Sequence, residues 1–143
     1  MALRDAKRQA RTFDEVRRAH QREVAEDYLE LIADLCDATG EARTVDLAER
    51  LGVTAATVNA ALHRLVRDGL VRKERYRSIF LTDAGRRVAE RSRERHRIVR
   101  DFLLALGIDP ETAETDAEGI EHHTSDETLR AFQAFLNGGR AGP

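Results

Sequence analysis

The chain has 143 residues, of which 35% are charged, and its formal net charge is −2. Its single cysteine, Cys36, cannot form an internal disulfide, which suits a reducing, cytoplasmic location. No apolar run approaches the roughly 18 residues that span a membrane, and the N-terminus lacks the apolar block of a signal peptide. Ala, Leu, Arg and Glu are abundant, so helices should dominate the fold.

The charge is distributed unevenly along the chain. Residues 1–40 have a net charge of −2, residues 41–96 a net charge of +5, and residues 97–143 a net charge of −5. A basic middle flanked by acidic ends is typical of a module that binds a polyanion, joined to one that handles cations.

Residues 1–22 form a basic N-terminal extension, and its first eleven residues are expected to be disordered or to act as a basic arm. The stretch 12–15 (Thr-Phe-Asp-Glu) fits a helix capping box. An amphipathic helix should follow over 24–38, either starting there or continuing from the segment before it, and Gly40 should end it. Its polar side is either a solvated face or the site of a counter-ion, and carries an acidic stripe of Glu23, Asp27, Glu30, Asp34 and Asp37.

Residues 44–81 have the pattern of a winged helix-turn-helix. Gly52 supplies the tight turn between the two helices, and a hairpin with a basic tip follows them. The expected elements are a helix over 45–51 capped by Thr44, a helix over 55–68 capped by Thr54, and strands over 71–75 and 78–81.

The second of these helices should enter the major groove of DNA with its N-terminal residues at the base edges. Arginines of this region should contact phosphates, which position the protein without reading sequence. For Asn59 and His63 an ordinary solvated helix face is the alternative. The predicted DNA-binding residues are Thr54, Ala56, Thr57, Asn59, Ala60, His63, Arg64, Arg75 and Arg77.

The C-terminal part should be helical. Thr82 is expected to cap a helix over 83–106, which places His96 among apolar neighbours. Asp109 and Pro110 should begin a short helix that ends near residue 115. The remaining expectations are a further helical turn or two over 116–123, a capping box over 124–127, a last helix over 126–137 and a loose tail to residue 143. The apolar faces of 98–106 and 129–136 are larger than one helix pair buries, which suggests a dimer interface.

Glu118, Glu121 and His122 are spaced i, i+3 and i+4, so a helix places them on one face. They form either a metal site or a solvated face, and His96 is either a ligand or a core residue. Carboxylates and imidazoles without thiolates favour ions such as Mn²⁺ or Fe²⁺. The sequence contains no catalytic triad, phosphate loop or zinc-finger spacing, so neither an enzyme nor a small-molecule substrate is expected.

Several stretches together carry a family resemblance. The stretch 116–123 (Asp-Ala-Glu-Gly-Ile-Glu-His-His) is the most specific of them. The others are 26–30 (Glu-Asp-Tyr-Leu-Glu), 47–51 (Leu-Ala-Glu-Arg-Leu) with Thr57-Val58, Leu81-Thr82 with Gly85, and Arg95-His96. In these stretches the chain resembles the manganese transport regulators, the short Mn²⁺-responsive branch of the diphtheria-toxin-repressor family of metal-dependent transcriptional regulators.

The resemblance implies a mainly α fold without an SH3-like domain. Residues 23–90 would form the winged helix-turn-helix DNA-binding domain, and residues 91–143 the helical dimerisation and metal-binding domain. It also implies two Mn²⁺ ions per subunit. Asp27, Glu118, Glu121 and His122 would hold one ion, and Glu30 and His96 the second, with Glu118 and Glu121 bridging both.

The iron-responsive relatives have a methionine in place of Asp27 and a cysteine in place of Glu118, and these softer ligands favour Fe²⁺. The carboxylates of this chain therefore point to Mn²⁺. The function implied is a Mn²⁺-responsive regulator, acting as a repressor of manganese transport genes, in which metal orders a homodimer for operator binding. The alternatives are an Fe²⁺- or Zn²⁺-responsive regulator of the same family, and a metal-independent winged-helix regulator.

Overall fold

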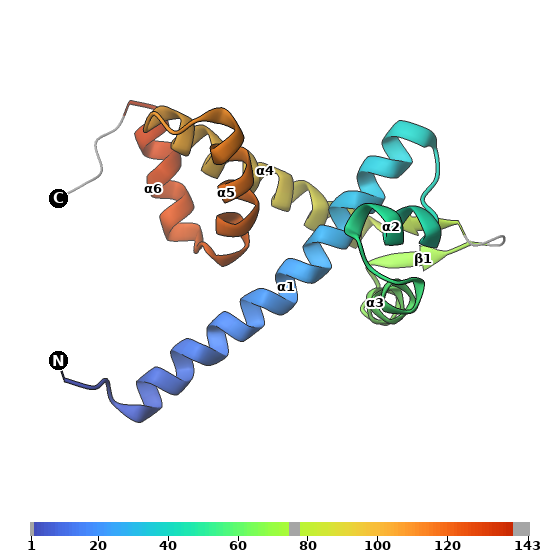
Figure 1. Ribbon diagram of the computed structural model, residues 1–143, viewed down its shortest axis with the longest axis horizontal. Coiled ribbons are helices and arrows are strands. Elements are labelled where there is room, and N and C mark those ends of the chain that lie inside the picture. Colours follow the sequence, from blue (N-terminus) through green and yellow to red (C-terminus); the bar gives the residue numbers. More distant parts are fainter. Residues whose placement is uncertain (1, 75–77, 139–143) are drawn as a thin grey trace. The chain divides into compact units, whose positions relative to one another are not determined.

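The computed structural model describes residues 2–74 and 78–138 (Figure 1). Contacts divide the chain into two compact units, one of Val24–Arg93 and one of Met1–Glu23 with Glu94–Pro143. The fold is mainly helical with a two-stranded sheet, as predicted. The elements are α1 (Ala6–Thr39), α2 (Thr44–Leu51), α3 (Ala55–Arg67), β1 (Val71–Lys73), β2 (Ile79–Leu81), α4 (Asp83–Ala105), α5 (Pro110–Ile120), the 3-10 helix η2 (Glu121–His123) and α6 (Asp126–Leu136).

Helix α1 is longer than the sequence pattern indicated. The expectation of a disordered N-terminus is wrong, because the helix begins at Ala6. The capping box over 12–15 is also wrong, since the Thr12 hydroxyl donates to the Arg8 carbonyl at 3.1 Å within the helix. The Asp5 carboxylate, 3.3 Å from the Arg8 backbone nitrogen, accepts a bond from the first turn instead. No glycine or proline lies between residues 6 and 39, so nothing interrupts the helix before Gly40.

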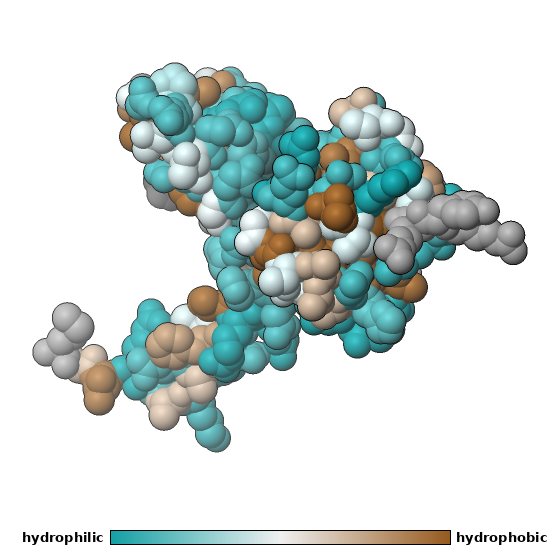
Figure 2. Space-filling view, turned by 45° about the vertical axis from the view of Figure 1, so that its right-hand side comes forward, coloured by the Kyte–Doolittle hydropathy of each residue, from teal (hydrophilic) through white to brown (hydrophobic). Residues whose placement is uncertain are grey.

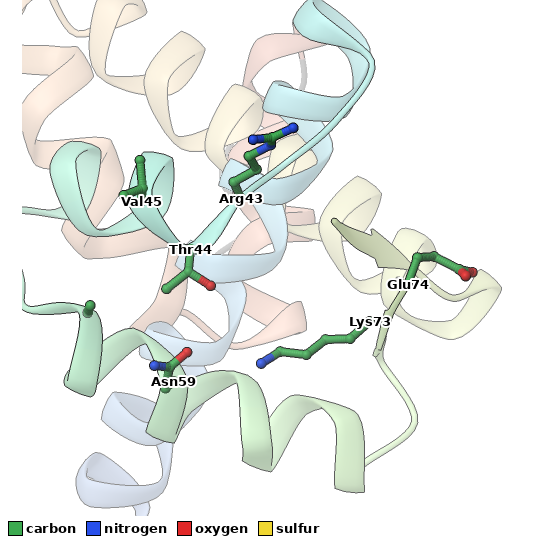
Figure 3. Close-up of a pocket in the computed structure, with 7 residues that line it drawn as sticks. Arg43, Thr44, Val45, Asn59, Lys73 and Glu74 are labelled. Atoms are coloured by element: carbon green, nitrogen blue, oxygen red, sulfur yellow. The ribbon is translucent and has the colours of Figure 1, made fainter. Parts of the chain in front are cut away.

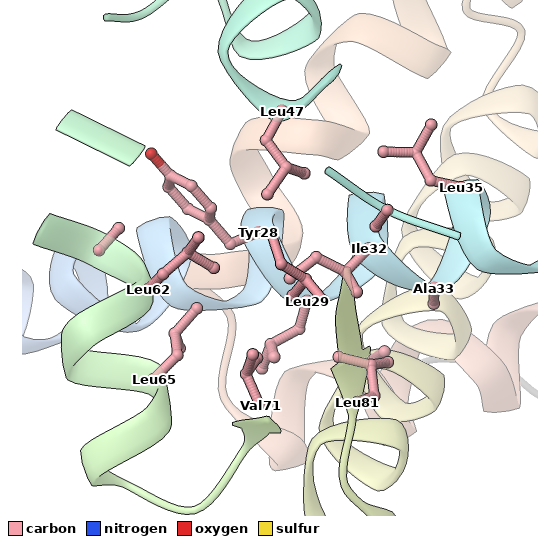
Figure 4. Packing of buried hydrophobic residues seen from close by; sticks show 14 of the residues in the cluster. Tyr28, Leu29, Ile32, Ala33, Leu35, Leu47, Leu62, Leu65, Val71 and Leu81 are labelled. Atoms are coloured by element: carbon pink, nitrogen blue, oxygen red, sulfur yellow. The ribbon is translucent and has the colours of Figure 1, made fainter. Parts of the chain in front are cut away.

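The unit Val24–Arg93 is built around the apolar face of α1. Leu29 and Ile32 are fully buried there, together with Leu47 of α2 and Leu62 of α3 (Figure 4). Burial of each such side chain stabilises the fold by about 1.5–3 kcal/mol relative to exposure. This core fixes the helix-turn-helix on α1.

The helix-turn-helix has the predicted turn. Gly52 adopts a left-handed conformation (φ 68°), which a side chain would strain. Thr54 caps α3 as predicted, because its hydroxyl accepts from the Thr57 backbone N–H at 3.1 Å. The predicted cap of α2 is wrong: Thr44 is the first helical residue, and Arg43 occupies the cap position in an extended conformation. A bridge between Ala42 and Ile79 keeps the chain extended up to this point.

The wing is an antiparallel pair in which Val71 lies opposite Leu81 and Lys73 opposite Ile79. The hairpin tip over 75–77 lies outside the described residues. At the base of the wing, a Cβ atom on Gly85 would lie 2.0 Å from the Leu70 carbonyl oxygen. Glycine is therefore the residue that permits this close approach of α4 to the strand.

In the other unit, α5 and α6 pack on α4. Val99, Ala117 and Leu129 form its buried cluster, and Phe102 stacks on Phe132 with ring centroids 4.0 Å apart. The predicted break near residue 115 is wrong, because α5 is one helix from Pro110 to Ile120. The sequence 111–118 contains no residue that stops a helix. Ser125 caps α6 by accepting from the Thr128 backbone N–H at 3.2 Å, one residue later than the predicted capping box over 124–127 would place the cap. The tail over 139–143 lies outside the described residues.

Hydrophilic side chains cover most of the face shown in Figure 2. Within the described ranges, no helix is both long enough and apolar enough to cross a membrane. Large apolar side chains that remain exposed near the C-terminal end of α4 and on α6 are Leu104, Leu106, Ile108 and Phe135.

Candidate functional site

Three of the predicted metal ligands meet within one compact unit. Ala113 and Ala117 are fully buried, so α5 lies close to its neighbours and carries its carboxylates toward α4. One ligand atom each from His96, Glu118 and Glu121 lies within 4.8 Å of the other two. The structure thus brings together a residue of α4 and residues of α5 and η2, as the sequence analysis predicted.

His96 is oriented by a carboxylate that was not predicted. Its Nε2 atom lies 2.7 Å from Oε1 of Glu114. Its Nδ1 atom lies 3.4 Å from Oε1 of Glu118 and 4.0 Å from Oε2 of Glu121. Among the described residues, this buried Nδ1 atom has no hydrogen-bond partner. A proton on Nε2, donated to Glu114, leaves the Nδ1 lone pair directed at a position that a cation would fill.

Glu121 and His122 are buried, with exposed fractions of 0% and 1%. The Glu121 Oε1 atom lies 3.1 Å from the His122 Nε2 atom. A carboxylate removed from water is costly unless positive charge compensates it. Glu118, by contrast, has a side chain that is 55% exposed. This donor set of carboxylate oxygens and imidazole nitrogens, without sulfur, fits Mn²⁺ or Fe²⁺.

The remaining predicted ligands, Asp27 and Glu30, lie on α1 in the unit Val24–Arg93. Both are half-buried, and the spacing of three places them on one side of the helix. Glu30 accepts a hydrogen bond from the hydroxyl of Ser92, a buried residue of α4. That Asp27 and Glu30 bind the same metal ions as Glu118 and Glu121 stays a prediction.

The contacts of Glu114 with His96 and of Ser92 with Glu30 were not predicted from the sequence. Glu114 precedes Glu118 by four residues, so a continuous α5 would have placed both on one face. The predicted break near residue 115 hid this signal. Ser92 precedes His96 by four residues on α4, but no local pattern showed that it meets Glu30.

Glu23 lies in the compact unit that contains His122 and His123. Its Oε2 atom is 2.9 Å from Nε2 of His123 and 3.4 Å from Nδ1 of His20. Burial acts to raise the pKa of Glu23, but the hydrogen bond to His123 and the charges of the nearby imidazoles hold that pKa below its usual value. Glu23 was predicted to lie in the acidic stripe, and no partner was predicted for it.

The predicted DNA-reading residues of α3 are accessible. Every one described is exposed: Thr54, Ala56, Thr57, Asn59, Ala60, His63 and Arg64. The hydroxyl of Thr54 donates to that of Thr57 at 3.0 Å, so these two side chains are already ordered at the helix N-terminus. Arg75 and Arg77 lie outside the described residues.

A cleft of about 740 Å³ lies beside α3 (Figure 3). Lys73 extends from β1 toward α3, and Asn59 lies on the opposite wall. Arg43 also lines the cleft. Lys73 and Arg43 were not predicted as DNA-binding residues, although Lys73 is a basic residue of the predicted strand over 71–75 and Arg43 directly precedes the predicted cap Thr44.

The chain is similar to known proteins over most of its length. Residues 21–79 match the model of the iron-dependent repressor N-terminal DNA-binding domain, and residues 82–141 match that of the iron-dependent repressor metal-binding and dimerisation domain. The chain is 54% identical over 123 residues to transcriptional regulator MntR of Escherichia coli O6:H1, covering 86% of this chain and 79% of the relative. The MntR of Salmonella typhimurium is also 54% identical, over 86% of this chain and 78% of the relative.

Two solved structures extend the comparison. A manganese-dependent transcriptional repressor in complex with manganese is 35% identical with a TM-score of 0.71, covering 79% of this chain and 52% of that chain. The manganese regulator SloR is 29% identical with a TM-score of 0.70, covering 79% and 53%. The chain therefore spans about half the length of the solved structures that it matches.

Proposed function

We infer the function from the family, because the chain belongs to the MntR branch of the diphtheria-toxin-repressor family of metal-dependent transcriptional regulators. The function proposed is a Mn²⁺-responsive DNA-binding repressor of manganese transport genes. It would act in the cytoplasm and have neither catalytic activity nor a small-molecule substrate. The convergence of His96, Glu118 and Glu121 around one position is the observation that carries the proposal.

The proposed ligand set contains six residues and two ions per subunit. Glu118 and Glu121 would bridge the ions, with His96 and Glu30 completing one site. The other site would be completed by Asp27 and His122. The Nδ1 atom of His96 supports the first assignment, because it is buried, faces two carboxylates and makes no hydrogen bond among the described residues.

The DNA half of the proposal rests on α3. Its exposed threonines and asparagine can hydrogen-bond base edges, and alanine methyl groups can contact thymine methyls. Arg64, Arg75 and Arg77 would contact phosphates. A homodimer would present two copies of α3 to two half-sites. The exposed Leu104, Leu106 and Phe135 supply apolar surface for such an interface.

The coupling between metal and DNA would run through α1 and α4. Asp27 and Glu30 share α1 with Leu29 and Ile32, which anchor the helix-turn-helix core. In the proposed ligand set the carboxylates of Asp27, Glu30, Glu118 and Glu121 would come together, and without a cation they would repel one another. Bound Mn²⁺ would supply the positive charge that offsets this repulsion. The ligand residues would then favour the arrangement of the two DNA-binding units that fits an operator.

The decisive experiment is DNA binding titrated in parallel with Mn²⁺, Fe²⁺ and Zn²⁺. The probe is a fluorescently labelled DNA duplex that the protein itself selects from a random library. Its binding is measured by fluorescence anisotropy. Binding should require metal and respond to Mn²⁺, and chelator should abolish it. Equal affinity with Mn²⁺ and with chelator would refute the proposal, and a response to Fe²⁺ or Zn²⁺ alone would establish the alternative sensor.

A matched pair of variants locates the metal effect. Asp27→Ala combined with Glu121→Gln should abolish the Mn²⁺ response of DNA binding. Glu111→Gln, which changes an exposed carboxylate at the start of α5, should preserve it. Unchanged Mn²⁺-dependent DNA binding in the double variant would show that these acidic residues do not bind the metal.

A further inference from the structure

We propose that the N-terminal half of α1 carries a basic face that binds the phosphate backbone of duplex DNA without reading its sequence. The inference rests on the proposed function only in taking DNA as the partner. It gives a role to a segment that contains neither proposed metal ligands nor predicted DNA-binding residues. The exposed residues that form this basic face are Arg4, Lys7, Arg8, Arg11, Arg18 and Arg22.

The charge of α1 changes sign along one uninterrupted helix. Residues 2–22 carry seven basic and three acidic side chains, so their net charge is +4. Residues 23–40 carry six acidic side chains and no basic one, so their net charge is −6. The acidic half contains the metal ligands proposed on α1, whereas the proposed function does not use the basic half. A concentration of positive charge of this kind attracts polyanions.

Helical spacing gathers the basic residues on one side of α1. Successive residues are rotated by about 100° around a helix, so residues 7, 8, 11, 18 and 22 fall within an arc of about 100°. The rise of about 1.5 Å per residue spreads them over roughly 22 Å along the helix axis. The basic face is therefore a narrow stripe, a shape that suits a linear array of phosphates.

The N-terminal end of the basic face surrounds a hollow of about 560 Å³. Arg4, Arg8 and Arg11 line this hollow together with the carboxylates of Asp5 and Glu15. Asp5 is engaged at the start of the helix, where it accepts from the Arg8 backbone nitrogen at 3.3 Å. Among the described residues, the guanidinium groups of the three arginines form no ion pair, whereas that of Arg18 pairs with Asp14. The three arginines are therefore available to phosphate groups.

A different side of the same helical segment packs against the protein. Ala19 is buried, and Oε2 of Glu23 lies 2.9 Å from Nε2 of His123. Helical geometry rotates Arg11 by about 80° from Ala19 and about 120° from Glu23. The packing of α1 on η2 thus leaves the basic face toward solvent.

The composition of this segment favours duplex DNA over other polyanionic partners. A helix that lies on a membrane needs a broad apolar face, but Phe13 and Val16 are the only large apolar side chains of the sequence between residues 6 and 22. Single strands are bound by stacking bases on aromatic rings, and Phe13 lies about 160° around the helix from Arg11. Arginine and lysine without aromatic neighbours contact phosphate oxygens, which position a protein on a duplex.

The test measures how DNA binding by the full-length chain depends on salt. One variant combines Arg4→Gln, Arg8→Gln and Arg11→Gln, because glutamine has a helix propensity close to that of arginine. A second variant replaces the same three residues by lysine and keeps their charge. Circular dichroism checks the helical content of every variant. A matched control removes three charges from exposed positions outside the basic face, through Arg17→Gln, Arg91→Gln and Arg130→Gln.

The probe is a fluorescently labelled duplex of arbitrary sequence, studied with chelator between about 50 and 200 mM salt. Loss of three phosphate contacts should make the slope of log K against log salt concentration shallower by about 2.7. The ratio of wild-type to variant affinity should therefore fall roughly 40-fold across this range. The control and the lysine variant should keep the wild-type slope. Arg11→Gln alone should change the slope by about 0.9, which keeps the test available if the triple glutamine variant loses helix.

This duplex requires neither metal nor an operator, so the result does not depend on whether DNA binding responds to Mn²⁺. A glutamine variant with the same slope as the control would overturn the inference. A loss of affinity confined to the selected operator would also overturn it, because phosphate contacts weaken binding to all sequences alike. An unchanged DNA slope together with lost binding to phosphatidylserine vesicles would assign the basic face to a membrane surface instead.

Discussion

Removal of the Glu114 carboxylate should weaken Mn²⁺ binding, although this residue is outside the proposed ligand set. Glu114 accepts from His96 Nε2 at 2.7 Å and thereby fixes the ring with Nδ1 toward Glu118 and Glu121. Loss of such a supporting partner typically costs 10–100-fold in metal affinity. The Glu114 side chain is 53% exposed, so water can replace part of its role. We therefore expect Glu114→Ala to lower Mn²⁺ affinity about 10-fold, equivalent to about 1.4 kcal/mol.

The assay is a competition titration of Mn²⁺ against a fluorescent chelator, paired with DNA binding as a function of Mn²⁺ concentration. The DNA-binding midpoint should shift by the same factor, while the affinity at saturating Mn²⁺ stays at the wild-type value. Glu114→Gln keeps an oxygen acceptor and should lose less, and Glu111→Gln should lose nothing. An Mn²⁺ affinity of Glu114→Ala equal to that of the wild type would refute the role assigned to His96 Nδ1.

Three further predictions concern the DNA-binding unit. Gly85→Ala should lower the free energy of unfolding by about 1–3 kcal/mol, because its Cβ would overlap the Leu70 carbonyl; an unchanged thermal melting temperature would contradict this. Cys36 should react with iodoacetamide at pH 8 more slowly than a denatured control, because burial, then the charge of Asp37, raises the pKa of its thiol; equal rates would be inconsistent with the structure. Asn59→Ala should cost about 1–3 kcal/mol of discrimination at one base position in a library of operator variants, whereas a uniform loss on all sequences would indicate only backbone contacts.

The helix-turn-helix could be predicted because its signals are local. Gly52 supplies a turn that needs a left-handed residue, and Thr54 supplies a cap, so both boundaries follow from neighbouring residues. The predicted cap at Thr44 failed because a long-range bridge between Ala42 and Ile79 decides where α2 begins.

The candidate site shows the same division between local and distant information. The shared face of Glu118 and Glu121 follows from helical spacing, and the structure brings His96 to it. Contacts between segments distant in sequence cannot be read from the local sequence pattern. For this reason the contact between Glu23 and His123 was not predicted.

The absence of sulfur from the proposed ligand set has a consequence for chemical durability. Thiolate ligands are lost to peroxide by stepwise oxidation, and thioethers become sulfoxides. This chain has one cysteine and one methionine. The thiol of Cys36 is partly buried and donates to the Ile79 carbonyl at 3.6 Å, and Cys36 is not one of the proposed ligands. A donor set of oxygen and nitrogen atoms therefore lacks the thiolate and thioether groups that peroxide converts to oxidised sulfur species.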